Sequence, residues 1–168
     1  YKRADLVPNI EGKIRYIAKL YNEEVHVLAK SEYRTIDDLA GKRVNFGTEG
    51  SGTFMTASII FDDLGIDVDV ASDPEPIALE KLRAGELDAM VFVGGKPVAF
   101  IEEVNRSEQL HLLAIPPERI KAAYLPSELT PDIYPNLIDA GDPVETVAVT
   151  AVLAAFNWPA GHPRRVKL

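Results

Sequence analysis

The stretch "RVNFGTEGSGTFMTASIIFDDLG", from Arg43 to Gly65, predicts a strand, a glycine-rich loop and a helix in that order. The run from Arg43 to Phe46 has the β-branched and aromatic residues of a short strand. From Thr53 to Leu64, apolar residues recur at helical spacing, and Gly65 follows where a left-handed C-terminal cap is expected. A strand that passes through a loop into a helix is typical of one unit of an α/β sheet.

The residues on either side repeat this pattern. "TIDDLAGKR" predicts a short helical turn with Thr35 as its N-cap and Gly41 as its stop. Further segments follow, namely a strand in "DVDV" (67–70), a helix in "PEPIALEKLRAGE" (74–86), a strand in "LDAMVFV" (87–93), a turn and helix in "GGKPVAFIEEVNR" (94–106), and a strand in "LHLLAI" (110–115). We therefore expect one complete doubly wound parallel α/β lobe between about Thr35 and Ile115.

The two flanks lack such units but are apolar enough to need burial. Ile14 to Tyr21 and Val25 to Lys30 are predicted as two strands, and Val144 to Phe156 as a buried strand that leads to the start of a helix. We expect the flanks to belong together. The predicted domains are part of an outer lobe with a first crossing strand (1–34), an inserted α/β lobe (35–115), and a return crossing with another part of the outer lobe (116–168).

Composition excludes several classes of protein. The formal net charge is −8, so the average surface would repel a phosphate backbone, and we expect no nucleic-acid partner. The chain has no cysteine, which excludes disulfides and thiolate chemistry. Its apolar runs are shorter than the roughly 20 residues that a membrane helix needs, so we expect no direct insertion into a membrane.

The glycine-rich loop ends at a predicted helix N-terminus, which favours an anion. The N–H groups of about Ser51, Gly52 and Thr53 have no intrahelical partner there. Together with nearby hydroxyls and the helix dipole they suit a small carboxylate or phosphate. The alternative is that Ser51 and Thr53 only cap the helix while the glycines make a turn.

Known catalytic and nucleotide motifs do not fit the loop. It lacks the lysine of a Walker A motif, the spacing of G-x-G-x-x-G, and the G-x-S-x-G of a nucleophile elbow. Adjacent carboxylates such as Asp62 and Asp63 are interpreted as solvated helix faces. We therefore expect a protein that is not an enzyme, with no catalytic residue, no cofactor and no metal.

A second loop, "GGKP" after Val93, is predicted to lie beside the first, because the carboxyl ends of parallel strands share one edge of a sheet. Lys96 in this loop either meets an anion or lies on the surface. His26 alternates with Val25 and Val27, and we expect it to face solvent or a partner opposite the core. Trp158 is expected to pack in a core or between lobes.

Three segments together resemble the TAXI subfamily of solute-binding receptors of TRAP transporters: "DLAGKRVNFGTEGSGT", "GELDAMVFVGGKP" and "TVAV". The resemblance implies a type II periplasmic binding protein fold, with a ligand held between two α/β lobes. It also implies a periplasmic receptor that passes a small organic anion, glutamate-like or glutamine-like, a dicarboxylate or an oxoacid, to membrane permease subunits.

The resemblance also implies which residues bind the solute. The first loop of the family falls on Gly47, Thr48, Gly50, Ser51, Gly52 and Thr53. The second falls on Phe92, Val93, Gly94, Gly95 and Pro97, and a tyrosine-proline pair of the family falls on Tyr134 and Pro135.

Members of this subfamily have further strand and helix units before and after the part that matches. The resemblance therefore implies that this sequence holds one lobe and part of the other, with the signal peptide not included. We expect such a chain to bind solute weakly, because a carboxylate at one helix N-terminus gains only about 0.3 to 1 kcal/mol. Two alternatives stay open, in this order: a cytoplasmic effector-sensing domain of a transcription regulator, and an enzyme on the same fold.

Overall fold

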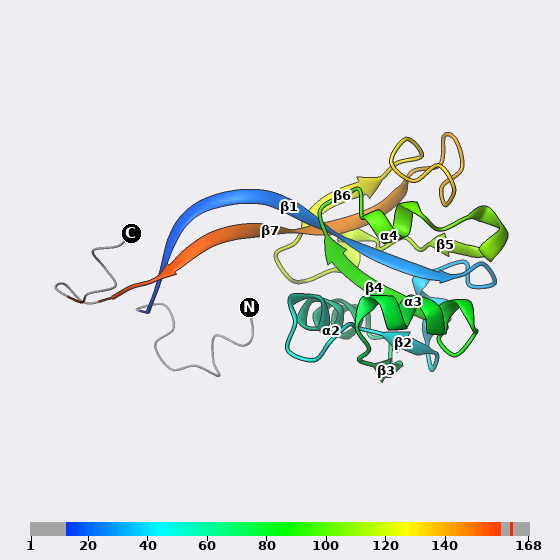
Figure 1. The fold of residues 1–168 in the computed structure, drawn as a ribbon, viewed down its shortest axis with the longest axis horizontal. Coiled ribbons are helices and arrows are strands. Elements are labelled where there is room, and N and C mark those ends of the chain that lie inside the picture. The colour runs from blue at the N-terminus through cyan, green and yellow to red at the C-terminus, as the bar shows by residue number, and fades with distance from the viewer. Residues whose placement is uncertain (1–12, 159–161, 163–168) are drawn as a thin grey trace. The chain divides into compact units, whose positions relative to one another are not determined.

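The computed structural model describes residues 13–158 and 162 of the chain, drawn in colour in Figure 1. By their contacts the residues divide into two compact units. One consists of Asn22–Val149, and the other of Tyr1–Tyr21 together with Thr150–Leu168. The lobes predicted from the sequence, with boundaries after residues 34 and 115, stay a prediction.

A single mixed sheet organises the strands. Its order is β3-β2-β4-β1-β7-β6, and β5 pairs with β1. The strands are β1 (Ile14–Lys30), β2 (Arg43–Asn45), β3 (Asp69–Ala71), β4 (Ala89–Gly94), β5 (Leu110–Leu112), β6 (Leu125–Leu129) and β7 (Val144–Phe156). β2 is parallel to β3 and β4, whereas β1 is antiparallel to β4 and β5. The predicted α/β class is confirmed, but only β3, β2 and β4 form its parallel part, because β1 enters the sheet in the opposite direction.

Helices follow each strand of the parallel part. They are α2 (Gly52–Leu64), α3 (Glu75–Arg83) and α4 (Ala99–Glu102), with the 3-10 turns η2 (Ile36–Leu39), η3 (Arg106–Glu108) and η4 (Pro117–Arg119). Gly65 ends α2 with a φ of 71°, as predicted. The helix expected in 94–106 is a single turn, because Asn105 has an extended backbone and caps the separate turn η3.

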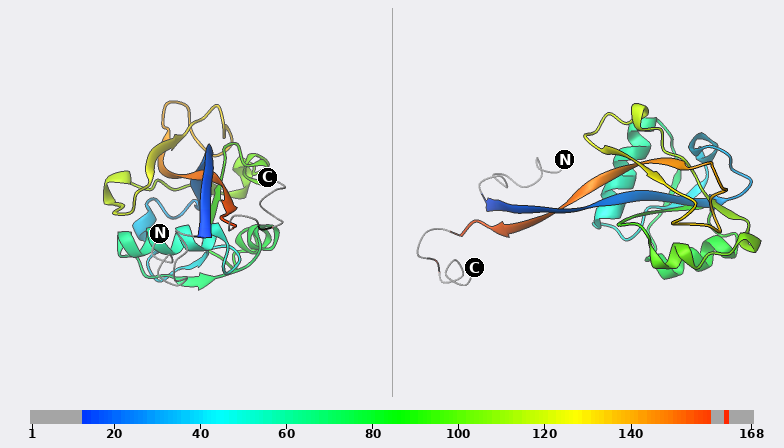
Figure 2. Two further views of the ribbon diagram at one scale, coloured as in Figure 1. Left: turned by 90° about the vertical axis from the view of Figure 1, so that its left-hand side faces the viewer. Right: turned by 90° about the horizontal axis from the view of Figure 1, so that it is seen from above.

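Three strand predictions need correction. β1 is one continuous strand through "NEE", where Glu24 pairs with Gly94 of β4. β7 stays extended to Phe156 and starts no helix, and β1 and β7 run side by side in the sheet (Figure 2). β6, which was not predicted, pairs antiparallel with β7 despite Pro126 within it. A proline is tolerated in an edge strand because its missing N–H is not needed there.

Two apolar clusters cover the two faces of the sheet in the unit of Asn22–Val149. On one face, Val25 and Val27 of β1 pack with Ile60 and Phe61 of α2. On the other face, Leu28 of β1 packs with residues of α3 and α4 and with Tyr134 and Ile138. The segment of β1 from Glu24 to Ala29 is therefore buried on both faces, and this overturns the expectation that His26 faces solvent or a partner opposite the core.

The other unit has no buried core, because none of its described residues is buried. Its strands expose large apolar side chains by 45% to 59%, namely Ile14, Tyr16, Ile17, Leu20, Tyr21, Val152, Leu153 and Phe156. Trp158 packs against rings, with centroid distances of 4.5 Å to Phe156 and 4.2 Å to His162.

Candidate functional site

The two glycine-containing loops lie at one edge of the sheet. β2 and β4 are parallel, with Val44 opposite Ala89 and Asn45 opposite Met90, so both strands end at this edge. β1 is antiparallel to β4 with Glu24 opposite Gly94, which brings Glu24 to the same place. All of these residues belong to the unit of Asn22–Val149.

The first loop leads into the N-terminus of α2, a helix of 13 residues. The Ser51 hydroxyl accepts a hydrogen bond from the Phe54 N–H at 3.1 Å, so Ser51 is the N-cap. The N–H groups of Gly52 and Thr53 have no acceptor among the described residues. They are the free donors that a helix N-terminus presents to an anion.

The backbone of this loop depends on glycine at two positions. Gly47 and Gly50 have φ angles of 78° and 82°, which residues with a side chain rarely adopt. A Cβ on Gly47 would lie 3.3 Å from Cγ2 of Thr53, so Thr53 also closes over this position. Thr48 and Glu49 are exposed, and Glu49 is the one charged residue between Phe46 and Phe54.

The second loop begins where β4 ends. Val93 packs with the cluster under α2, whereas the Phe92 ring packs edge to face on Phe100 with centroids 5.1 Å apart. A Cβ on Gly94 would lie 2.6 Å from Cε1 of Phe92, so a larger residue would displace this ring. Gly95 and Pro97 are exposed, and the peptide bond before Pro97 is cis.

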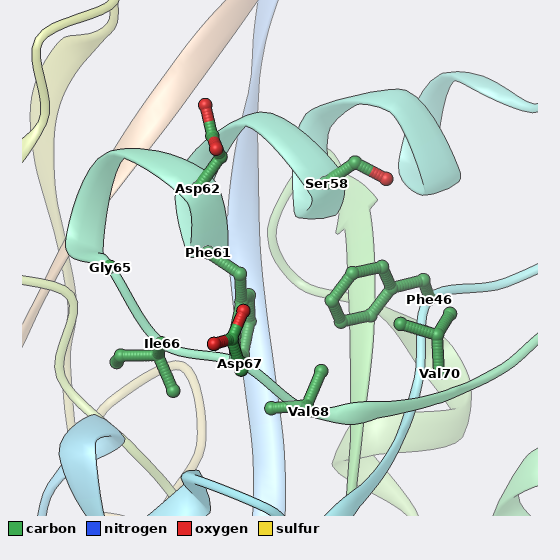
Figure 3. Close-up of a pocket in the computed structure, with 9 residues that line it drawn as sticks. All are labelled: Phe46, Ser58, Phe61, Asp62, Gly65, Ile66, Asp67, Val68 and Val70. Carbon is green, nitrogen blue, oxygen red and sulfur yellow. The ribbon is translucent and has the colours of Figure 1, made fainter.

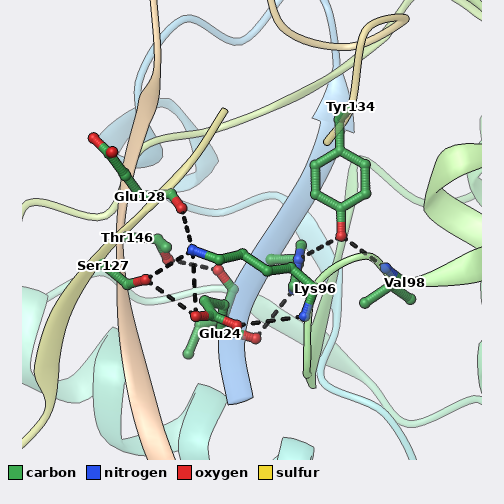
Figure 4. Close-up of polar contacts among 9 residues, drawn as sticks. Glu24, Lys96, Val98, Ser127, Glu128, Tyr134 and Thr146 are labelled. Carbon is green, nitrogen blue, oxygen red and sulfur yellow. Dashed lines mark hydrogen bonds and ion pairs between the residues drawn. The ribbon is translucent and has the colours of Figure 1, made fainter. Parts of the chain in front are cut away.

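Lys96 is held by protein groups. Its Nζ donates to the Glu128 carbonyl at 2.6 Å and to the Ser127 hydroxyl at 3.2 Å, and it lies 3.4 Å from Oε1 of Glu24 (Figure 4). Ser127 in turn donates to the same Glu24 oxygen at 3.1 Å. Lys96 therefore forms an ion pair inside the fold, a role that the sequence did not indicate. Glu24, whose side chain is only 7% exposed, neutralises it.

Tyr134 lies beneath the second loop. It is 1% exposed, and its hydroxyl accepts a hydrogen bond from the Val98 N–H at 2.9 Å. The same hydroxyl lies 2.9 Å from Nε2 of His26. The loop residues of the predicted site thus share one edge, whereas Tyr134 does not present its hydroxyl to solvent.

His26 is fully buried, contrary to the expectation that it faces solvent or a partner opposite the core. The second apolar cluster and Tyr134 cover this face of β1. Burial lowers the pKa of His26 to about 4 and raises the pKa of Tyr134 to about 12. Both groups are therefore neutral at physiological pH.

Two cavities in the described residues have linings that do not include Gly52 or Thr53. One, of about 380 Å³, lies beside the C-terminal half of α2, and its lining includes Phe61, Asp62, Asp67 and Val68 (Figure 3). Another, of about 350 Å³, lies between α3 and α4 and includes Phe92 and Phe100.

The described residues contain no group of three or more histidine or acidic residues that could hold a metal ion. They also contain no helix with the length and apolar character needed to cross a bilayer.

A model of the NMT1-like family matches residues 9–157. The chain belongs to this family. Its fold is also similar to that of several solved structures. An ancestral arginine-binding protein bound to glutamine has 15% identity and a TM-score of 0.47, with 96% of this chain and 56% of that chain covered. The GluR0 ligand-binding core from Nostoc punctiforme in complex with L-glutamate has 18% identity and a TM-score of 0.44, with 95% and 57% covered.

A third similar structure is the CcmR regulatory domain of Synechocystis PCC6803 in complex with 2-PG. It has 16% identity and a TM-score of 0.48, with 86% of this chain and 61% of that chain covered. The chain thus spans little more than half of the length of these structures.

Proposed function

We propose that this member of the NMT1-like family is the solute-binding part of a periplasmic receptor of the TAXI type. It captures a small organic anion, glutamate-like, a dicarboxylate or an oxoacid, for the permease subunits of a TRAP transporter. The observation that carries the proposal is the pair of N–H groups on Gly52 and Thr53, which have no acceptor among the described residues, at the edge of the sheet where β2 and β4 both end.

The charges around these donors define how the anion is held. Lys96 is neutralised by Glu24, and Glu49 adds a negative charge, so the two loops offer no free cation. The attraction then comes from the helix dipole, which contributes about 0.3 to 1 kcal/mol, and from hydrogen bonds to a charged acceptor, each of which contributes about 1.5 to 3 kcal/mol. Two such bonds give about 4 kcal/mol before the cost of association is subtracted, so we expect a dissociation constant in the millimolar range or weaker.

Titration of the 15N-labelled chain with L-glutamate, 2-oxoglutarate and succinate tests the proposal. We expect saturable chemical-shift changes at Gly52 and Thr53 of α2 and at Gly94 and Gly95 of the second loop. Cadaverine, a cation of similar length, is the control ligand and should leave these amides unchanged. The proposal would be contradicted if none of the three acids changed the chemical shifts, or if the changes did not include Gly52 and Thr53.

The double substitution Ser51→Ala with Thr53→Ala removes two hydroxyls from the loop. We expect about tenfold weaker binding, because a hydrogen bond to a charged group is worth about 1.5 kcal/mol or more. We also expect about 1 kcal/mol less free energy of unfolding from loss of the N-cap. NMR titration and urea unfolding give the two values, and Ser107→Ala, which removes an exposed hydroxyl elsewhere, is the control.

Glu49→Gln tests the sign of the ligand charge. Glu49 lies in the same short loop as the free donors and is exposed, so removing its charge should strengthen binding of an anion about twofold at low salt. The control is Glu118→Gln in η4, which removes an exposed charge from another element. Weaker binding in the Glu49 variant would mean that the ligand presents a positive group to this loop.

A further inference from the structure

The second loop is anchored from inside the fold by one face of β1. Glu24 and His26 are two residues apart in a strand, so their side chains point to the same face. Glu24 accepts from the Lys96 backbone N–H at 3.4 Å and pairs with its ammonium group. His26 reaches Val98 through the hydroxyl of Tyr134. Figure 4 shows this hydroxyl pointing toward the Val98 backbone.

The hydrogen bonds at His26 run in one direction. Its Nδ1 lies 3.0 Å from the Glu24 carbonyl, and a carbonyl can only accept, so Nδ1 carries the proton. Nε2 is therefore an acceptor, and the Tyr134 hydroxyl donates a hydrogen bond to it. The hydroxyl oxygen accepts from the Val98 N–H. Each buried group thus has a partner, and the chain runs from Val98 through Tyr134 to His26.

A proton on Nε2 would disrupt this chain of hydrogen bonds. The Tyr134 hydroxyl could then no longer donate to His26, and its own proton would be left without an acceptor in an interior where an unpaired polar group is unfavourable. The charged groups that act on the pair are Glu24 and Lys96, which form their own ion pair, and Glu102 of α4. Of these only Lys96 is positive.

We infer that His26 and Tyr134 are positioning residues, which hold the backbone of residues 94–98 in the conformation that faces the solute. The inference rests on the proposed function of this loop. Gly94 and Gly95 have no side chains to hold them, so the loop depends on its anchors at Lys96 and Val98. Tyr134 thus acts through Val98 and not by contact with the solute.

Tyr134→Phe tests the inference, because it removes one hydroxyl and keeps the ring. The matched control is Tyr33→Phe, since Tyr33 is also buried and donates its hydroxyl to Asp88 at 2.9 Å, in a network of Lys30 and Arg43. In the Tyr134 variant we expect the Val98 amide to exchange about tenfold faster, and L-glutamate to bind about tenfold more weakly. In the Tyr33 variant neither quantity should change by more than about twofold.

The outcomes separate this inference from the proposed function. Unchanged Val98 exchange in the Tyr134 variant, or an equal effect in both variants, overturns the inference. Faster Val98 exchange with glutamate binding intact also overturns it, because the loop conformation would then not matter to the ligand. If the unaltered chain binds no acid at all, the proposed function fails, and with it the role of these residues in binding. The anchoring of the loop is then judged by Val98 exchange alone.

A spectroscopic measurement on the unaltered chain covers the case in which the variant does not fold. The two imidazole nitrogens of His26 should show the proton on Nδ1, the less common form of a neutral histidine. As the pH is lowered, the amides of Gly95 and Val98 should shift with the same midpoint as the His26 ring. A proton on Nε2 at neutral pH, or amides that do not follow the ring, would overturn the inference.

Discussion

A buried histidine in a β-strand makes the stability of this protein depend on pH. The folded protein disfavours the charged imidazole, because burial lowers the pKa of His26 from 6.5 to about 4. Below pH 6.5 the unfolded chain therefore binds a proton that the folded chain does not. His26 makes no difference to stability above this pH, and stability falls as the pH drops from about 6.5 to about 4.

We expect the loss from His26 to reach about 3 kcal/mol at pH 4, as the difference between the two pKa values indicates. Urea unfolding at a series of pH values measures it. His26→Gln should make the free energy of unfolding depend less on pH between pH 6.5 and 4. Burial also lowers the pKa of His111, so this residue contributes in the same direction. His111→Gln is therefore the control, and it should keep the larger part of the dependence of stability on pH. An unchanged slope in the His26 variant would contradict this account.

At the scale of single residues, the sequence around His26 contained a signal for burial that the prediction did not use. The alternation of Val25, His26 and Val27 was interpreted as one buried and one solvated face. The run continues through Leu28 and Ala29 without a polar residue, which is typical of a strand buried on both faces. That signal could have placed His26 in the interior. The partner, Tyr134, is 108 residues away in sequence, and no local pattern connects the two.

At the scale of elements, Asn45 connects two of the loops at the site edge. It is 1% exposed at the end of β2. Its Nδ2 donates to the Asp73 carbonyl at 3.2 Å, and the Asp73 N–H donates to its Oδ1 at 2.7 Å. The Asp73 carboxylate pairs with Lys81 of α3 at 2.8 Å. Asn45 therefore ties the loop before α3 to the strand that leads to α2.

Asn45→Ala should lower the free energy of unfolding by about 2 kcal/mol, because two hydrogen bonds are lost and the half-buried backbone groups of Asp73 are left unpaired. Urea unfolding monitored by circular dichroism measures the change. Asn136→Ala, at an exposed asparagine, is the control and should change stability by less than about 0.5 kcal/mol. A similar small change in Asn45→Ala would show that the loop before α3 is held by other contacts.

Elements with signals at both ends were predicted best. α2 has an N-cap at Ser51 and a left-handed glycine at Gly65, and its bounds agree with the sequence to within one residue. α4 and β7 were predicted less well. Their lengths depend on partners, because an apolar run such as "VETVAVTAVLAAF" suits a strand or a helix until pairing with β6 and β1 selects the strand.

At the scale of the whole molecule, the two compact units differ in how much they bury. β1 passes from one to the other, and its residues from Glu24 to Ala29 are buried, whereas those from Ile14 to Leu20 are exposed or only half-buried. Local stability follows buried contacts, so different parts of one strand can open at different free energies.

Amide hydrogen exchange should show this difference within β1. We expect Val25 to Ala29 to exchange only through global unfolding, and Ile14 to Leu20 to exchange faster by orders of magnitude. β7 provides an internal replicate, with Thr146 to Ala148 slow and Val152 to Phe156 fast. Equal protection along either strand would mean that its exposed part is covered in solution.

The sequence by itself determined the α/β class, the course from β2 through the glycine loop into α2, and the positions of the caps, because these depend on residues close together in the chain. It also indicated that two loops meet at one edge, since parallel strands that each lead into a helix allow little else. Only the tertiary structure decided that β1 enters antiparallel beside β4, that Glu24 neutralises Lys96, and that His26 reaches Val98 through the hydroxyl of Tyr134. These contacts join residues far apart in sequence, and buried polar groups must find their partners wherever the packed core brings them.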